Sequence, residues 1–272
     1  MKKLKLLDTF SGIGGFSYAA EKLIGGFSYA AKLVGNIKTT QFIEIDQFCQ
    51  KVLAKNFPNT PIHDDIRTFT AEPFQFDAVC GGFPCTDIST AGKRLGITKE
   101  TRSGLFYELM RVIRMVRPKY IILENVAAIL NNGLDIVLGE LSEGGYNAEW
   151  STFRASDTVQ ACHHRDRWFL VAYKRTFTNP QGIGMEGMRS SREQVKLKME
   201  KTGLSKWGYK RRLLSPNWRS YTSEPCLRRG DDGLRDRTHR LRALGNSVIP
   251  ACAAIPLQRV KDIHDQLTTV DH

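Results

Sequence analysis

The sequence lacks any long apolar run, since no stretch of roughly 18 or more consecutive apolar residues occurs in it. A transmembrane helix needs about 20 such residues, so we expect no membrane span. The first eight residues, Met1 to Asp8, are partly basic but contain neither a long apolar stretch nor a small-residue cleavage site. They are typical of a first β-strand rather than of a secretory signal, which favours a cytoplasmic protein.

Cysteine is scarce and follows no ligand spacing. The six cysteines include no Cys-x-x-Cys pair, and 272 residues with 41% hydrophobic composition can form a core without disulfides. His163-His164 is the nearest hint of a metal site, but without cysteines at ligand spacing we expect no metal. A reduced setting leaves any single cysteine free for chemistry; they stand at positions 49, 80, 85, 162, 226 and 252.

Positive charge is concentrated in one segment. The net charge is +12, and residues 174–242 hold 18 Lys or Arg against 7 Asp or Glu, so nearly the whole surplus lies there. Aromatic residues such as Trp207 and Tyr209 are interleaved with this charge. The segment favours a polyanionic partner, because release of counterions drives sequence-independent binding to phosphates. A solvated basic face is the alternative interpretation.

The first part of the chain alternates strand-like and helix-like segments. This alternation predicts an α/β fold with βαβ units and a mostly parallel sheet. Between residues 104 and 116, for example, Leu105, Leu109 and Val112 share one helical face, and Pro118 ends the helix. The expected strands are 3–8, 38–45, 76–80, 120–123 and 168–173, and the expected helices are 46–56, 104–116 and 134–142.

The periodic pattern fades between residues 175 and 237, which are rich in Gly, Ser, Lys and Arg. This composition predicts a small, loop-rich lobe rather than a continuation of the sheet. Helical character returns from His239 onward, and we expect Pro250 and Pro256 to break this helix into pieces.

One segment is duplicated almost perfectly: residues 13–23 read IGGFSYAAEKL and residues 24–33 read IGGFSYAAKL. A solenoid needs three or more such units. A helix could absorb an 11-residue shift, about three turns, although Gly25 and Gly26 would each cost roughly 1 kcal/mol relative to alanine. Only the first copy follows Leu-Asp-Thr-Phe-Ser-Gly, so we expect it to form the strand-to-helix turn and the second copy to be an insertion.

A glycine-rich turn, Asp8-Thr-Phe-Ser-Gly-Ile-Gly-Gly15, joins the first expected strand to a helix. Glycines let a ligand approach the backbone, although such glycines are as often purely structural. Glu44 ends the next strand, where an acid is well placed for ribose hydroxyls. Asp65-Ile66 follows, where it could meet an adenine edge. Together these features indicate a ligand that contains adenosine.

A second group of reactive residues is expected at the same end of the sheet. Cys85 follows Gly-Gly-Phe-Pro after one strand, and Glu124 ends another. Arg165 and Arg167 lead into the next strand and, two residues apart, face the same way. Taken alone, Cys85 is more typical of a buried, inert thiol. With an acid and two guanidinium groups beside it, the set predicts a nucleophilic site.

Taken in order, these motifs resemble the cytosine-5 DNA methyltransferase family of bacteria and phages. The resemblance runs from residue 4 to about 260, apart from 175–220, and its most specific part is the Pro-Cys and Glu-Asn-Val pair. The matching motifs are DTFSGIGG (8–15), FIEID (42–46), DDI (64–66), GGFPC (81–85) with Ser89, SGLF (103–106), ENV (124–126), HHRDRW (163–168) and RALGNSVIP (242–250).

The resemblance implies a Rossmann-like, S-adenosylmethionine-dependent methyltransferase domain at 1–174 and a small, loop-rich DNA-recognition lobe at 175–237. A C-terminal helical segment, 238–272, would return to the catalytic domain and fold back against the first turn. The cofactor-binding residues that the resemblance implies are Phe10, Ser11, Gly12, Ile13, Gly15, Glu44, Ile45, Asp65, Ile66, Pro84, Leu105, Asn246 and Val248.

The resemblance also implies a mechanism. Cys85, as thiolate, would add to carbon 6 of a cytosine flipped out of duplex DNA, so that carbon 5 can accept a methyl group. Glu124 would share a proton with the ring nitrogen, and Arg165 would hold the ring oxygen. Arg167 would fix the site or contact phosphate.

The family also implies partners and a setting. Duplex DNA is the expected partner, joined by a companion restriction endonuclease if the gene belongs to a restriction–modification system. We expect a monomer in the cytoplasm of a bacterial cell, a prophage carrier or a phage-infected host. Arginines of the recognition lobe are expected to contact phosphates more often than bases.

The sequence departs from the family at three places. Thr86 stands where many members carry glutamine, Cys162 stands where proline is usual, and the duplication falls in the helix that opens the cofactor pocket. One alternative is therefore a relic that binds DNA without methylating it. A second is a cytosine methyltransferase acting on RNA, and a third is a small-molecule methyltransferase, which would not need the basic lobe.

Overall fold

A seven-stranded sheet forms the centre of the molecule in the computed structural model, which describes residues 3–21, 37–84, 104–156, 165–174 and 237–269. The strand order is β3-β2-β1-β4-β5-β7-β6; the first five strands are parallel, and β7 is antiparallel to both of its neighbours. The predicted α/β fold is confirmed. The strands are β1 (Leu4–Thr9), β2 (Ile37–Ile43), β3 (Ile62–His63), β4 (Ala78–Gly82), β5 (Tyr120–Val126), β6 (Tyr146–Arg154) and β7 (Asp166–Lys174).

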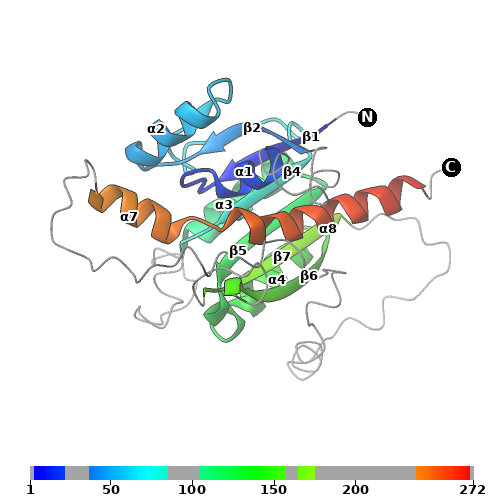
Figure 1. Ribbon diagram of the computed structural model, residues 1–272. Helices are drawn as coiled ribbons and strands as arrows, with labels where there is room; N and C mark the ends of the chain where they lie inside the picture. The colour runs from blue at the N-terminus through cyan, green and yellow to red at the C-terminus, as the bar shows by residue number, and fades with distance from the viewer. Residues whose placement is uncertain (1–2, 22–36, 85–103, 157–164, 175–236, 270–272) are drawn as a thin grey trace, which may run out of the picture.

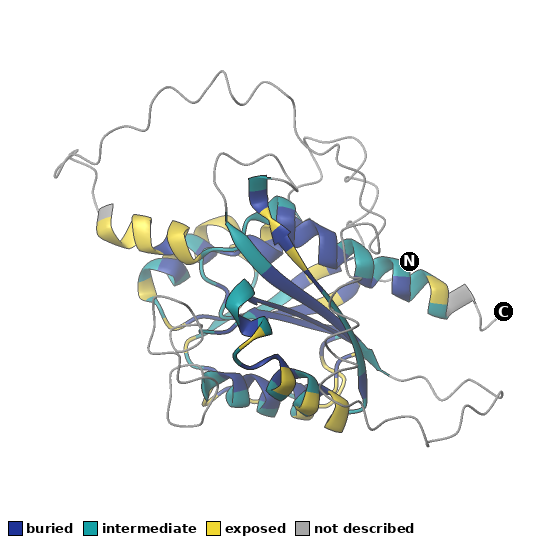
Figure 2. Cartoon of the chain, turned by 90° about the horizontal axis from the view of Figure 1, so that it is seen from below, coloured by how far each residue is buried: buried dark blue, intermediate teal, exposed yellow. Residues whose placement is uncertain are grey.

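Helices cover both faces of the sheet (Figures 1 and 2). Alternate residues of a strand point to opposite faces, so Leu6 of β1 packs in the cluster with α1 and α8, and Leu7 packs in the cluster with α3 and α4. No helix in the described part of the chain has the length and apolar character needed to cross a bilayer. The helices are α1 (Gly15–Glu21), α2 (Gln47–Asn56), α3 (Leu105–Val116), α4 (Leu134–Glu143), α7 (Arg237–Asn246) and α8 (Pro250–Thr269), with a 3-10 turn η4 (Ala127–Leu130).

The expected strands and helices of residues 3–173 are all present, with ends shifted by at most about three residues. Two strands were missed. β3 is only two residues long, and β6 is an edge strand that pairs with β7 alone. Six of the nine residues of β6 are partly buried or exposed, which explains the weak apolar pattern of its sequence.

The prediction for Pro250 is confirmed, because the helical segment is interrupted between Asn246 and Pro250, whereas the prediction for Pro256 was wrong. Pro250 begins α8, where its missing N–H would be unpaired in any helix, and Pro256 lies inside α8 without ending it. The helix continues past Pro256 because its apolar side packs on the sheet: Ala253, Leu257 and Val260 are fully buried. Tertiary packing therefore outweighs the lost backbone hydrogen bond.

The first copy of the duplicated segment forms α1, as predicted, while the second copy lies outside the described residues. Ser17 donates a hydrogen bond to Asp8 at 2.5 Å, and the Glu21 carboxylate accepts one from the backbone N–H of Thr39 at 2.7 Å. Residues 24–31 repeat residues 13–20 letter for letter, and Lys32 then corresponds to Glu21. Glu21 is therefore the first position at which the two copies differ, and its contact is one that a lysine cannot make.

This difference yields a matched pair of deletions. Removing residues 22–32 or residues 14–24 leaves a single copy and otherwise identical chains, with glutamate at this position in the first variant and lysine in the second. We expect the glutamate variant to be more stable by about 1.5–3 kcal/mol, the usual contribution of a hydrogen bond to a charged group. Urea unfolding measures the difference. Equal stability of the two variants would show that the Glu21 contact contributes nothing.

Candidate active site

The turn after β1 has an unusual backbone. Phe10, Gly12 and Gly14 have φ angles of 51°, 53° and 86°, and Phe10 is a non-glycine residue in the left-handed region, which costs roughly 1–2 kcal/mol. Hydrogen bonds hold the turn in place: the Ser11 hydroxyl donates to the Asp8 carbonyl at 2.6 Å, and the Ser11 N–H donates to the Ile43 carbonyl at 3.2 Å. The turn is thus fixed against the end of β2.

Glu44, which follows the end of β2, lies directly against this turn. One carboxylate oxygen accepts the N–H of Gly12 at 2.6 Å, and the other accepts the N–H of Asp46 at 2.8 Å. Burial raises the pKa of Glu44, while these two backbone hydrogen bonds oppose the shift. Ile45 follows with 65% of its surface exposed, unusual for isoleucine, so an acid and an apolar side chain lie together beside the glycine turn.

The C-terminal segment returns to the same turn. A Cβ atom on Gly15 would lie 2.5 Å from Val248 Cγ1 and 2.6 Å from the Val248 carbonyl oxygen. Val248 therefore lies directly against the start of α1. Asn246, which ends α7, is exposed.

Gly15→Ala is expected to destabilise the protein by roughly 1–3 kcal/mol, because the added methyl group would push the start of α1 away from Val248. Gly139→Ala is the matched control. Gly139 lies within α4 with open space around it, so there alanine should stabilise the helix by roughly 0.5–1 kcal/mol. Thermal unfolding of both variants gives the comparison. A Gly15→Ala variant as stable as its parent would contradict the close packing described.

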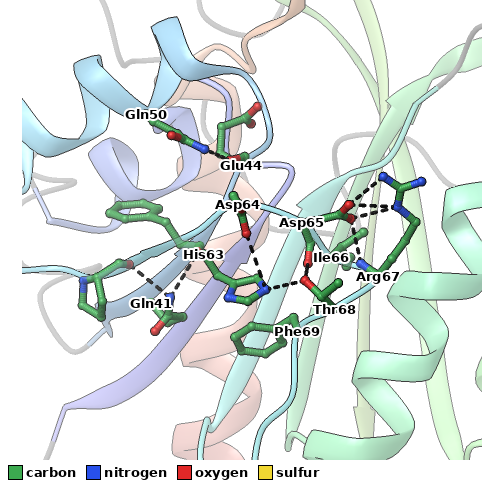
Figure 3. A network of polar contacts seen from close by, with 12 residues as sticks. Gln41, Glu44, Gln50, His63, Asp64, Asp65, Ile66, Arg67, Thr68 and Phe69 are labelled. Carbon is green, nitrogen blue, oxygen red and sulfur yellow. Dashed lines mark hydrogen bonds and ion pairs between the residues drawn. The ribbon is translucent and has the colours of Figure 1, made fainter.

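Asp65 and Ile66 lie in a turn after β3 (Figure 3). The Asp65 carboxylate binds Arg67 through three hydrogen bonds of 2.6–3.0 Å, which hold the pKa of Asp65 below its usual value. Ile66 is buried in the core. His63 contacts Thr68 at 3.0 Å, so the turn is tied back to the strand that precedes it.

A second constellation lies where β4 and β5 end. Gly82 pairs with Glu124, and a Cβ atom on Gly82 would lie 2.8 Å from a Glu124 carboxylate oxygen, so glycine leaves room for the acid. Asn125 donates to the Phe83 carbonyl at 3.2 Å, which fixes the backbone two residues before Cys85. Asn125 was not predicted as a functional residue, although it stands in the Glu-Asn-Val motif. Cys85 itself lies outside the described residues, while Pro84 is partly buried.

The carboxylate of Glu124 and the guanidinium of Arg167 form an ion pair at 2.9 Å. Burial raises the pKa of Glu124, and the charges of Arg167 and Arg165 act in the opposite direction. Both predicted arginines therefore act on the predicted acid. A buried carboxyl with a raised pKa keeps its acid form to a higher pH than an exposed glutamate does, so it is suited to deliver a proton.

Phe10 and Leu105 both pack, half-buried, against the apolar cluster between the sheet and α3. They come from the first turn and from the start of α3. The cluster thus connects the glycine turn with the helix that follows the predicted nucleophile.

Asp8 was not predicted as a functional residue. It is buried in β1, and burial raises its pKa to about 7, while the Ser17 hydroxyl and the Cys80 thiol oppose the shift. Ser17 in turn accepts a hydrogen bond from Thr39 at 2.8 Å. The aspartate at the start of the glycine motif thus anchors α1 beneath the turn.

Several predicted features lie outside the described residues. They are Ile24 (the counterpart of Ile13 in the second copy), Cys85, Ser89, Ser103, Cys162, His163, His164 and nearly all of the expected recognition lobe.

Within the residues that are described, no cluster of His, Cys, Asp or Glu could hold a metal ion.

Known proteins resemble this chain in both sequence and fold. The family model described as C-5 cytosine-specific DNA methylase matches residues 4–206. The type II methyltransferase M.CviJI of Paramecium bursaria Chlorella virus IL3A is 33% identical over 176 residues, which cover 64% of this chain and 44% of that relative. M.BanI of Aneurinibacillus aneurinilyticus is 31% identical over 204 residues, which cover 72% of this chain and 45% of that relative.

A solved structure of the Entamoeba histolytica methyltransferase EhMeth superposes with a TM-score of 0.51 at 19% identity, over 66% of this chain and 55% of that one, which supports the fold alone. The chain spans less than half the length of the two curated relatives named above. The family match covers well over half of the chain and includes all seven strands. The chain therefore belongs to the C-5 cytosine-specific DNA methylase family.

Proposed function

We propose that the protein is a DNA (cytosine-5-)-methyltransferase that acts on a cytosine flipped out of duplex DNA. One observation carries the proposal: the pair formed by the buried Glu124 and the half-buried Arg167 lies beside the end of β4, from which the chain passes through Pro84 to Cys85. A proton donor and a nucleophile must lie close together to act on one ring. The family match supplies the reaction class.

The residues around the first turn suit S-adenosylmethionine, the methyl donor of the family. The buried carboxylate of Glu44 can bind the ribose hydroxyl groups, and the exposed apolar side chain of Ile45 can pack against a face of the adenine ring. Asp65 remains ionised beside Arg67 and can accept a hydrogen bond from an exocyclic amine. When bound, S-adenosylmethionine supplies the methyl group that carbon 5 of the cytosine receives. The remaining contacts are assigned to Phe10, Ser11, Gly12, Ile13, Gly15, Ile66, Pro84, Leu105, Asn246 and Val248.

The protein's own groups would make carbon 5 reactive. The Cys85 thiolate forms a bond to carbon 6, and the electron pair of the 5,6 double bond moves towards the ring nitrogen, where Glu124 delivers a proton. Arg165 holds the ring oxygen, and Arg167 keeps Glu124 in place. After methylation, a base removes the proton on carbon 5, the 5,6 double bond reforms and Cys85 leaves as thiolate. The ring nitrogen then returns its proton to Glu124.

The basic segment 174–242 is proposed to grip the DNA backbone while the sheet carries the chemistry. Its described end supports this, because Arg240 and Arg242 of α7 are exposed on a helix that extends beyond the sheet (Figure 2). Extrusion of the cytosine costs a few kcal/mol of stacking, which such contacts can offset.

The biological setting is an extension of the same proposal. Relatives of the chain are named type II methyltransferases, which suggests a companion restriction endonuclease whose cutting this protein would prevent. We propose that it acts as a monomer in the cytoplasm of a bacterial cell, a prophage carrier or a phage-infected host.

Transfer of tritium from labelled S-adenosylmethionine tests the proposal, with duplex DNA and RNA as parallel substrates. We expect label in duplex DNA alone. Label in RNA alone would favour an RNA methyltransferase. Label in DNA only with the variant lacking residues 14–24 would identify the full chain as a relic, and no label with either protein would refute the enzymatic function.

A further inference from the structure

Arg111 of α3 holds the turn that contains Asp65 and Ile66. Its guanidinium donates to the carbonyl oxygens of Ile66 at 2.5 Å, Phe69 at 3.1 Å and Arg67 at 3.2 Å. The Nε–H donates to Glu108, one helical turn earlier, at 2.7 Å. One side chain thus binds three carbonyls of a segment more than 40 residues away in sequence.

The hydrogen bonds within the turn go mainly to Asp65. The N–H of Arg67 donates to the Asp65 side chain at 2.9 Å, and the N–H and hydroxyl of Thr68 both donate to the Asp65 carbonyl at 3.1 Å. The Ile66 carbonyl accepts one long hydrogen bond within the turn, from the Phe69 N–H at 3.4 Å, and its shorter bond comes from Arg111. The side chains of Ile66 and Phe69 are buried in the core. Arg111 supplies donors to the carbonyl side, as a guanidinium fork can and a point charge cannot.

Arg111 also joins two parts of the proposed cofactor pocket. The turn carries Asp65 and Ile66, and α3 begins at Leu105, which is also assigned to the pocket. A shift of the turn relative to α3 would move the Asp65 carboxylate relative to the other wall. Positions of recognition groups must hold to a fraction of an ångström for a hydrogen bond to discriminate between ligands.

We propose that Arg111, aligned by Glu108, is a positioning residue for adenine recognition. The proposal rests on the proposed function, since it assumes that Asp65 meets the adenine. Arg111 does not touch the ligand; it acts through the carbonyls of the turn. Its specific consequence is selectivity for the exocyclic amine of adenine over the oxygen of hypoxanthine, which would face the Asp65 carboxylate as a second acceptor.

The test is calorimetric binding of S-adenosylhomocysteine and S-inosylhomocysteine to the full chain. For the unaltered protein we expect a preference of at least about 10-fold for the adenosine compound, since the oxygen leaves Asp65 without a donor. Arg111→Ala should lower the affinity for S-adenosylhomocysteine by about 10-fold and reduce the preference towards one. Arg111→Lys, which keeps the charge, should give an intermediate preference, and it serves as the test if the alanine variant does not fold.

Arg114→Ala is the matched control, because Arg114 lies on the same helix but pairs with Glu140 of α4. It should keep the full preference. If Arg111→Ala and Arg111→Lys weaken both ligands equally, Arg111 is only a structural residue and the proposal is overturned. If the unaltered protein binds neither ligand, the proposed cofactor site fails, and the role of Arg111 fails with it.

Discussion

Cys85→Ser is expected to lower methyl transfer to duplex DNA by at least about 10⁴-fold, as loss of a catalytic nucleophile does in other enzymes. Serine keeps the shape of the side chain but does not form an anion at neutral pH, so it cannot add to carbon 6. Binding of S-adenosylhomocysteine should remain within a few-fold of the parent protein. Tritium transfer and calorimetry on the same preparation separate the two effects.

Cys49→Ser is the matched control for this substitution. Burial raises the pKa of the Cys49 thiol to about 12, so it is not a thiolate at neutral pH. This variant should keep nearly full activity. Equal activity of the Cys85 variant and the parent protein would rule out Cys85 as the nucleophile.

Glu124→Gln is expected to reduce the rate of methyl transfer by about 10²–10⁴-fold, the usual contribution of a general acid. The amide keeps the size of the side chain but cannot deliver a proton to the ring nitrogen, and it no longer neutralises Arg167. The affinity for S-adenosylhomocysteine should change little, because Glu124 is not assigned to the cofactor pocket. Glu149→Gln is the matched control, because it breaks the ion pair between Glu149 of β6 and Arg259 of α8. It measures the effect of losing a carboxylate–arginine contact away from the site.

The pH dependence gives the same experiment a second readout. Burial raises the pKa of Glu124, so its acid form persists further towards neutral pH than that of an exposed glutamate. Activity that needs the acid form is present below this raised pKa and is lost as pH rises through it. Glu124→Gln should remove that alkaline loss of activity. A variant that shows the unchanged alkaline limb would place the titration on another group.

The sequence predicts most of the sheet because its inner strands are short apolar segments that end in glycines or acids. β6 was missed because an edge strand with one partner needs few buried side chains, so its sequence carries little pattern. The helix break that we predicted at Pro256 is absent for a related reason. A helix-breaking residue acts on the isolated segment, whereas packing of α8 on the sheet decides the outcome.

At the site, the sequence identifies residues but not their partners. Glu44 and Glu124 could be predicted as functional from their position at strand ends, and the structure places Glu44 on the glycine turn. The pairing of Asp65 with Arg67 joins residues two positions apart, so it could be predicted from the sequence. The contacts of Arg111 with the Asp65 turn were not, because they depend on how α3 packs against a segment more than 40 residues earlier.

Mapping of a trapped covalent adduct tests the role of Cys85 most directly. Duplex DNA in which cytosine carries fluorine at carbon 5 lacks the proton whose loss expels the thiolate, so the bond between sulfur and carbon 6 should persist. Mass spectrometry of the digested complex should find the nucleotide on the peptide that contains Cys85, and only when S-adenosylmethionine is present. An adduct on another cysteine, or none with DNA that the protein methylates, would contradict the assignment.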